Sequence, residues 1–184
     1  MKRLFVVSGS SGVGKGTVLK EFMAAHPEFK LSISCTTRSK RPGEVDGVNY
    51  FFITKDEFQE AVQNGDFLEW AEFSGNCYGT RKSFIQKSLD RGENIILEID
   101  TQGGLQIKDI MPDAVLIFIA PPSFEELEQR LRGRKTEGEE VIQERLAQAN
   151  REREASKQYD YVIVNDTISD TVKQLEKIVL SYTD

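Results

Sequence analysis

The fold is decided by the stretch Gly9-Ser10-Ser11-Gly12-Val13-Gly14-Lys15-Gly16-Thr17. It follows a short apolar run at residues 2–8, which predicts a buried strand, and leads into residues 15–25, which predict a helix. Glycines in such a loop let several backbone N–H groups point at one anion, and the helix N-terminus adds its dipole. Lys15 supplies a mobile cation for the terminal phosphates. The stretch therefore predicts a loop that binds the phosphates of a nucleoside triphosphate, with all nine residues as candidate contacts.

The position after the lysine departs from the usual phosphate loop. That position ordinarily holds Ser or Thr, whose hydroxyl binds Mg²⁺. Here it is Gly16, and Thr17 comes one residue later. Thr17 is therefore a candidate metal ligand that could act either directly or through a water molecule.

Apolar runs and helical stretches alternate along the rest of the chain. Strands are predicted at residues 31–34, 50–53, 67–73, 94–99, 114–120 and 161–164, and helices at residues 81–90, 123–132, 137–157, 168–181 and from residue 55. Residues 35–49 are polar and rich in turn formers, which predicts a loop. The alternation predicts an α/β fold with a mostly parallel central sheet. The stretch from about 34 to 81 breaks the rhythm, and we expect it to form a small separate lobe.

Composition narrows the class of protein. The chain has 184 residues, 39% of them apolar and 29% charged, which suits one folded domain. The net charge of -6 argues against general nucleic-acid binding. Cys35 and Cys77 have no metal-ligand spacing, and no run is long enough to span a membrane. These features predict a cytoplasmic protein with small-molecule substrates and neither nucleic acid nor membrane as partner. His26, the one histidine, is expected in a loop rather than as a general base.

A second dense signal runs from Ser34 to Tyr50. It carries Arg38 and Arg41, three residues apart, and Tyr50 nine residues after the second arginine. Arginine forks match phosphate oxygens, so this segment predicts a second anion site. For an arbitrary sequence, a solvated basic loop is the more common explanation of such a pattern.

At this point the sequence resembles guanylate kinase. The resemblance rests on the phosphate loop and on Thr-Thr-Arg-x-x-Arg-x-Gly-Glu-x-x-Gly-x-x-Tyr from Thr36 to Tyr50. It extends in family order over nearly the whole chain, through five further blocks: Glu69; Tyr78-Gly79-Thr80; Ile96-Leu97-Glu98-Ile99-Asp100-x-Gln102-Gly103; Arg130-Leu131-Arg132-Gly133-Arg134; and Tyr159-Asp160-Tyr161-Val162-Ile163-Val164-Asn165-Asp166. The resemblance implies a three-layer P-loop kinase fold and ATP-dependent phosphorylation of GMP, and of dGMP as a further acceptor, to the diphosphate.

The resemblance also assigns roles to residues. Those matching GMP-phosphate positions are Arg38, Arg41, Tyr50 and Tyr78; those matching guanine positions are Ser34, Glu69 and Thr80. Asp100 matches an acidic residue close to the metal and the acceptor. Arg130, Arg134 and Arg145 match lid arginines that close over the ATP phosphates. The catalytic set implied is Lys15, Arg38, Arg134 and Arg145, with Mg²⁺ as cofactor near Thr17 and Asp100.

The chemistry explains why such residues are needed. Guanine presents two donors, N1–H and N2–H₂, that one carboxylate can accept together, whereas adenine would face that carboxylate with a lone pair. Glu69 satisfies this logic, with the hydroxyls of Ser34 and Thr80 near O6. The attacking phosphate oxygen has a second pKa of about 6, so the reaction needs no general base. It needs cations that bring two negative phosphates together in line.

The expected organisation is one domain in three parts. The core covers residues 1–33, 82–123 and 158–184, the GMP-binding lobe 34–81 and the lid 124–157, and both flanks are expected to close over the substrates. Two other functions stay open: a non-catalytic scaffold that binds phosphorylated peptides, and a P-loop kinase for another small metabolite. The sequence is compatible with a monomer or a homo-oligomer.

Overall fold

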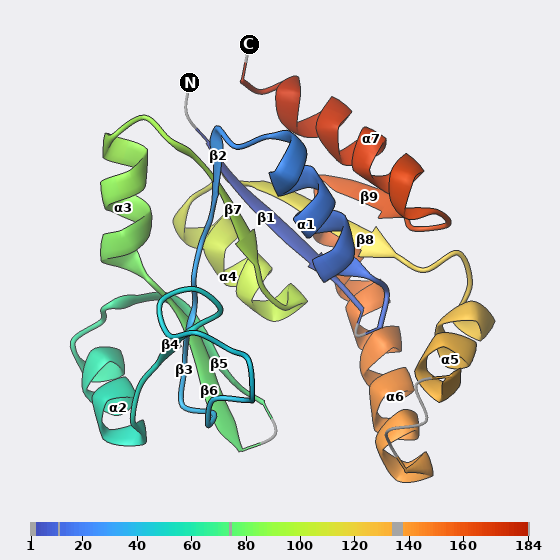
Figure 1. Cartoon of the computed structure of the whole chain (residues 1–184), viewed down its shortest axis with the longest axis horizontal. Helices are drawn as coiled ribbons and strands as arrows, with labels where there is room; N and C mark the ends of the chain where they lie inside the picture. Colours follow the sequence, from blue (N-terminus) through green and yellow to red (C-terminus); the bar gives the residue numbers. More distant parts are fainter. Residues whose placement is uncertain (1–2, 11, 74, 134–137, 184) are drawn as a thin grey trace.

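A five-stranded parallel sheet forms the centre of the molecule. In the computed structural model, which describes residues 3–10, 12–73, 75–133 and 138–183, the strand order is β2-β7-β1-β8-β9. The strands are β1 (Leu4–Gly9), β2 (Phe29–Leu31), β7 (Asn94–Glu98), β8 (Val115–Ala120) and β9 (Tyr161–Val164). Every pair in this sheet is parallel (Figure 1). Val6 lies in register between Leu97 and Leu116. The predicted α/β fold with a mostly parallel sheet is confirmed.

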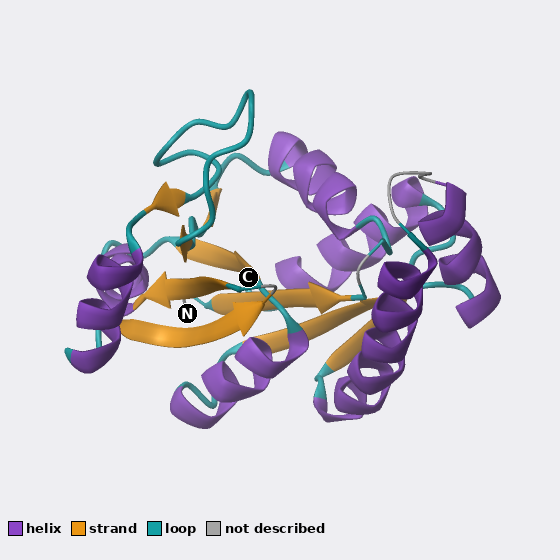
Figure 2. Ribbon diagram, turned by 90° about the horizontal axis from the view of Figure 1, so that it is seen from below, coloured by secondary structure: helices purple, strands orange, loops and turns teal. Residues whose placement is uncertain are grey.

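Helices cover both faces of this sheet, as Figure 2 shows from below. On one face, α1 (Lys15–Ala25) and α7 (Ile168–Leu180) pack side chains such as Phe22 and Leu175 against Phe5 and Val7. On the other face, α3 (Lys82–Asp90) and α4 (Thr101–Ile110) pack against Leu4 and Val6. Alternate residues of β1 point to opposite faces, so an unbroken apolar run serves two cores at once.

The segment after β2 builds a second sheet of four strands, ordered β4-β3-β6-β5. Its elements are β3 (Cys35–Thr36), β4 (Phe51–Phe52), α2 (Lys55–Gln63), β5 (Phe67–Phe73) and β6 (Asn76–Arg81). The ring of Phe58 from α2 stacks on Phe67, with centroids 4.5 Å apart, in a cluster of its own. A capping box between Thr54 and Glu57 fixes the start of α2.

Two helices after β8 project beyond the sheet. They are α5 (Phe124–Gly133) and α6 (Glu139–Ala155), followed by the short 3₁₀ turn η1 (Ser156–Gln158). Leu127 and Leu131 of α5 pack against Ile142 and Leu146 of α6. Ser123 caps α5 by accepting the Glu126 N–H at 3.0 Å. The pair therefore has its own small core and connects to the sheet through the end of α6.

Some element predictions were wrong. Residues 35–49 were predicted as a loop, but Cys35–Thr36 forms β3 between β4 and β6. The second strand was predicted at 31–34, but β2 ends at Leu31, after which the Ser32 N–H makes one more bond to the Ile96 carbonyl. Strand β6 and helix α4 were not predicted. Both contain glycines and polar residues, and tertiary contacts stabilise them where local propensity is weak.

Candidate active site

The phosphate loop connects β1 to α1 at the carboxyl edge of the parallel sheet, where ligands bind in open α/β folds. Gly12 and Gly14 have φ of 90° and 94°, a left-handed conformation that other residues adopt only with strain. The Val13 N–H bonds the Ser10 carbonyl at 3.1 Å, and the Asn165 amide donates to the Val13 carbonyl at 2.7 Å. The first bond stabilises the turn within the loop, and the second connects the loop to the residue that follows β9.

The loop encloses a pocket of about 480 Å³. It is lined by Gly9, Ser10, Gly12, Gly14, Lys15, Gly16, Thr17, Lys20 and Glu98. All residues of helix α1 are among those that the structure describes. The helix has no acidic residue in its first turn, and no side chain caps its first N–H groups. Its N-terminus is therefore available for an anion. Of the nine predicted contacts, Ser11 lies outside the described residues and Val13 is buried beneath the loop.

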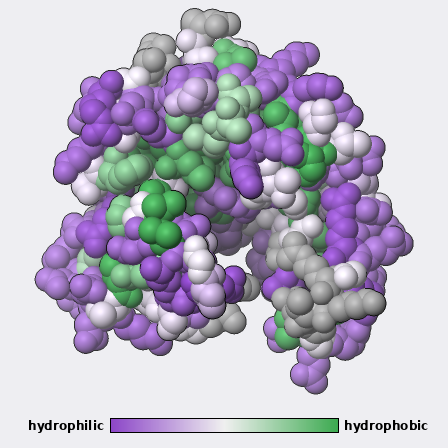
Figure 3. Space-filling view, viewed as in Figure 1, coloured by the Kyte–Doolittle hydropathy of each residue, from purple (hydrophilic) through white to green (hydrophobic). Residues whose placement is uncertain are grey.

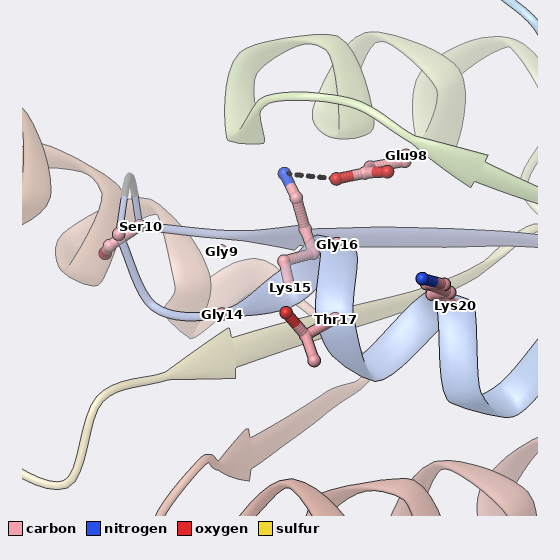
Figure 4. Close-up of a pocket in the computed structure, with 9 residues that line it drawn as sticks. Gly9, Ser10, Gly14, Lys15, Gly16, Thr17, Lys20 and Glu98 are labelled. Carbon is pink, nitrogen blue, oxygen red and sulfur yellow. Dashed lines mark ion pairs between the residues drawn. The ribbon is translucent and has the colours of Figure 1, made fainter. Parts of the chain in front are cut away.

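Lys15 connects this pocket to a second one. Its Nζ lies 4.0 Å from Oε1 of Glu98, which follows the buried residues of β7, and Figure 4 shows the lysine reaching from the start of α1 towards that carboxylate. Lys15 and Glu98 line both pockets. Glu98 lies in one of the blocks that carry the resemblance but had no predicted role. A polar residue that ends an otherwise apolar strand at the edge bearing the phosphate loop is the signal that could have found it.

The second pocket, of about 320 Å³, lies between the central sheet and the small sheet. Predicted acceptor residues that line it are Ser34, Tyr50, Glu69, Tyr78 and Asp100. Arg38, Arg41 and Thr80 do not line it. Figure 3 shows the surface hollowed between the part that carries the small sheet and the part that carries α5 and α6.

Glu69 is the carboxylate at the inner end of this pocket. It is 5% exposed, and the buried Thr80 hydroxyl donates to its Oε1 at 2.6 Å. Burial raises the pKa of Glu69 to about 7, against the opposing effect of the Thr80 bond, and the charge of Asp100 adds to the rise. The Thr80 hydroxyl thus orients Glu69, and its predicted contact with the ligand stays a prediction.

Arg38 is held by Glu44 rather than pointed into the pocket. Both guanidinium NH groups donate to the Glu44 carboxylate, at 3.0 and 2.7 Å, and the Arg41 backbone N–H donates to the same group at 2.8 Å. The Arg38 guanidinium lies 5.5 Å from the centre of the Tyr50 ring, which itself meets Tyr78 edge-on. Arg38 is therefore separated from the pocket by the side chain of Tyr50. Glu44 competes with any bound phosphate for the Arg38 guanidinium.

Asp100 follows β7 and caps α4, because its Oδ1 accepts the N–H groups of Gln102 and Gly103. This fixes the carboxylate at the wall of the second pocket and leaves Oδ2 free of those two bonds. Thr17 is exposed in the first turn of α1. The described residues contain no cluster of three or more acidic, histidine or cysteine side chains that could hold a metal on their own.

The predicted lid arginines are distributed over α5 and α6. Arg130 donates to Glu126 at 3.0 Å, and both of its NH groups lie 3.5 Å from the carbonyl of Asn165, beside the phosphate loop. Arg145 lies partly buried in α6. Arg134 lies outside the described residues. The structure thus places Arg130 next to the triphosphate pocket and leaves a direct phosphate contact by Arg145 as a prediction.

A phosphate loop at the sheet edge, joined through a lysine to a second polar pocket, defines a P-loop phosphotransferase that acts on a small acceptor. Comparison with known proteins narrows this class. A family model described as guanylate kinase matches residues 1–182, so the chain belongs to the guanylate kinase family.

Individual relatives agree with that assignment. The chain is 50% identical to a guanylate kinase of Synechococcus sp. (strain CC9311) over 94% of this chain and 90% of the relative. It is 49% identical to a guanylate kinase of Desulfitobacterium hafniense (strain Y51), over 97% and 89%. The crystal structure of guanylate kinase from Anaplasma phagocytophilum superposes with a TM-score of 0.80 at 33% identity, covering 98% of this chain and 86% of that one. The predicted resemblance is confirmed.

Proposed function

We propose that this chain transfers the γ-phosphoryl group of ATP to GMP, and also to dGMP, by direct in-line displacement. ATP occupies the pocket of the phosphate loop, and the acceptor occupies the pocket that contains Glu69. The two pockets share Lys15 and Glu98, which is the observation that carries the proposal. Two phosphates bound there meet across the Lys15 ammonium, the group best suited to neutralise charge between them.

Guanine selection is assigned to Glu69. Its ionised carboxylate accepts N1–H and N2–H₂ of the base, and the Thr80 hydroxyl holds it in place. Ser34 lines the same pocket, which supports its assignment to O6. A base that lacks those donors would leave the buried carboxylate with acceptor sites that the Thr80 hydroxyl does not satisfy, which costs more than the loss of a single contact.

The GMP phosphate is assigned to Tyr50, Tyr78, Arg38 and Arg41. Arg38 binds it after exchanging Glu44 for the phosphate, which gives the loop containing residues 34–50 two states, one for each partner. The lid arginines Arg130, Arg134 and Arg145 bind the ATP phosphates when the lid closes. Closure excludes water, and it involves the lobe at 34–81 and the lid at 124–157.

Guanylate kinases are ATP-using kinases that generally need Mg²⁺. The residues present fit that ion, because Asp100 keeps a carboxylate oxygen free of the bonds that cap α4 and Thr17 is exposed in the first turn of α1. Two protein oxygens are enough for Mg²⁺, because this ion keeps several water ligands and takes the rest of its ligands from the phosphates. We assign its binding to Thr17, through water, and to Asp100. The bound ion supplies positive charge to the phosphates.

The proposed setting is the cytoplasm, with ATP and GMP as small-molecule partners and with neither nucleic acid nor membrane involved. Among the described helices, none combines the length and the apolar character that a membrane span requires. The overall negative charge favours small phosphate ligands over nucleic acid.

The variant Glu69→Gln tests the acceptor site. The amide presents N–H donors to the donors of guanine, so we expect KM for GMP to rise by about one to two orders of magnitude while KM for ATP stays unchanged. Steady-state kinetics with each substrate varied in turn measure both constants. Glu72→Gln, exposed on the same strand β5, is the matched control. Wild-type GMP kinetics in Glu69→Gln would remove Glu69 from the base site.

A further inference from the structure

The first turn of helix α4 lies against the carboxylate that is assigned to guanine. Helix α4 packs against strand β5, which carries Glu69. The helix contributes Gly103 to this contact, and Gly103 is buried. A Cβ on Gly103 would lie 2.8 Å from Oε2 of Glu69 and 3.3 Å from its Cδ. The Glu69 side chain therefore occupies the space that a side chain at position 103 would need.

The backbone of α4 gives no reason for a glycine at this position. Gly103 has a helical conformation within α4, which any L-residue adopts without strain. Alanine in a helix interior is normally more stable than glycine, because glycine loses more backbone entropy on folding. The close approach of Glu69 is therefore the feature of the structure that accounts for Gly103.

Hydrogen bonds hold the first turn of α4 in place. Oδ1 of Asp100 accepts the N–H of Gly103 at 3.0 Å. The Asp100 carbonyl accepts the Ser8 hydroxyl at 3.2 Å, and the Thr101 carbonyl accepts the Tyr159 hydroxyl at 3.2 Å. These bonds connect the turn to β1 and to the residue that follows η1. We therefore expect an added methyl group at position 103 to move the Glu69 side chain rather than the helix.

Glu69 can give way only through its side chain. Its neighbour Leu68 packs into the core together with Ile107 of α4, which fixes the backbone of β5 next to Glu69. The carboxylate itself lines the acceptor pocket and accepts the Thr80 hydroxyl at 2.6 Å. A displaced carboxylate would leave the position in which it is assigned to accept N1–H and N2–H₂ of guanine.

We propose that Gly103 is a positioning residue for guanine recognition: because it has no side chain, it sets where the Glu69 carboxylate lies in the acceptor pocket. The proposal rests on the assignment of Glu69 to guanine under the proposed function. Gly103 is not among the described residues that line either pocket, so it acts through Glu69. The effect is confined to the acceptor, and the ATP site does not share it.

The variant Gly103→Ala tests the proposal. We expect KM for GMP to rise by about tenfold, which corresponds to the loss of one hydrogen bond to a charged group, while Kd for ATP stays within about twofold of wild type. Steady-state kinetics and titration calorimetry measure the two constants. The Tm is expected to equal or exceed that of the wild type, because a side chain gives way and alanine favours the helix. Gln102→Ala, which alters an exposed residue of the same turn, is the matched control.

A double variant separates displacement of the carboxylate from other damage to the pocket. Glu69→Gln already removes the paired acceptance of the guanine donors, so a displaced side chain has little left to lose. Adding Gly103→Ala to Glu69→Gln is therefore expected to lower kcat/KM for GMP by less than about twofold.

An unchanged KM for GMP in Gly103→Ala would overturn the proposal, and so would a loss in the double variant equal to the product of the two single losses. A lowered Tm or a failure to fold would overturn it as well, because either would show that Gly103 is kept for packing. Failure of the proposed function would look different: the wild-type chain would show no turnover with ATP and GMP, or Glu69→Gln would keep wild-type GMP kinetics.

Discussion

At the scale of single residues, the site was predictable where chemistry and sequence spacing coincide. Lys15 and the glycines of its loop line the first pocket, and Glu69 lines the second; their roles in binding stay predictions. Contacts that depend on tertiary packing were not predictable: the Arg38–Glu44 ion pair, the Asn165–Val13 bond and the burial of Glu152 in α6. Nothing in the local sequence of Asn165 or Glu152 distinguishes it from an ordinary loop or helix residue.

Glu69 also makes the reaction sensitive to pH. Its pKa of about 7 means that the carboxyl is mostly neutral at pH 6 and mostly ionised at pH 8. Only the ionised form accepts both guanine donors, so KM for GMP is expected to fall by about tenfold between these values. The same raised pKa opposes stability as pH rises from 4.5 to about 7, because the folded state retains a proton that the unfolded chain releases.

Steady-state kinetics at pH 6, 7 and 8 measure this dependence. The second ionisation of GMP lies in the same range, so Glu69→Gln serves as the control that reports the substrate alone. A KM for GMP with the same pH profile in both proteins would contradict the assignment to Glu69.

At the scale of elements, prediction succeeded where one periodicity dominates. Strands β5 and β9 and helix α1 have the predicted bounds, since each is a strongly patterned run between clear breakers. Helix α4 was missed because it contains Gly103 and Gly104, which weaken helix propensity. The structure explains both glycines: a Cβ on Gly103 would lie 2.8 Å from Oε2 of Glu69, and one on Gly104 would lie 2.1 Å from the Tyr159 hydroxyl.

The substitution Gly104→Ala tests whether close packing outweighs propensity in α4. Alanine in a helix interior normally gains about 1 kcal/mol over glycine. Here the added methyl group collides with Tyr159, whose hydroxyl donates to Ser8 and to the Thr101 carbonyl, so we expect a net loss of about 1–3 kcal/mol. Denaturant unfolding measures the change.

Tyr159→Phe provides the matched background, because it removes the colliding oxygen. Gly104→Ala should cost less in that background than in the wild type. An alanine variant as stable as the wild type would show that α4 or Tyr159 shifts freely, contrary to the tight packing inferred here.

At the scale of the whole molecule, two small substructures with their own apolar clusters flank one central sheet. The sequence predicted a small lobe at residues 34–81, where the βα rhythm breaks, and the resemblance to the family implied a lid at residues 124–157; the second sheet and the helices α5 and α6 lie within these ranges. It could not predict that the two pockets meet at Lys15 and Glu98, because that meeting depends on how the small sheet sits against β7. Because the two pockets share these residues, the fold favours a single phosphoryl transfer between two bound nucleotides.

The acceptor preference of the wild-type chain is the most direct test of that reading. A coupled assay of ADP release with GMP, dGMP, AMP, UMP and CMP compares kcat/KM for each, with Lys15→Ala as the folded but inactive control. We expect turnover with GMP and dGMP and a kcat/KM for AMP lower by a factor on the order of 10⁴. Activity on AMP or UMP equal to that on GMP would contradict guanine recognition by Glu69. If none of the five acceptors supported the release of ADP, that result would contradict the kinase function itself.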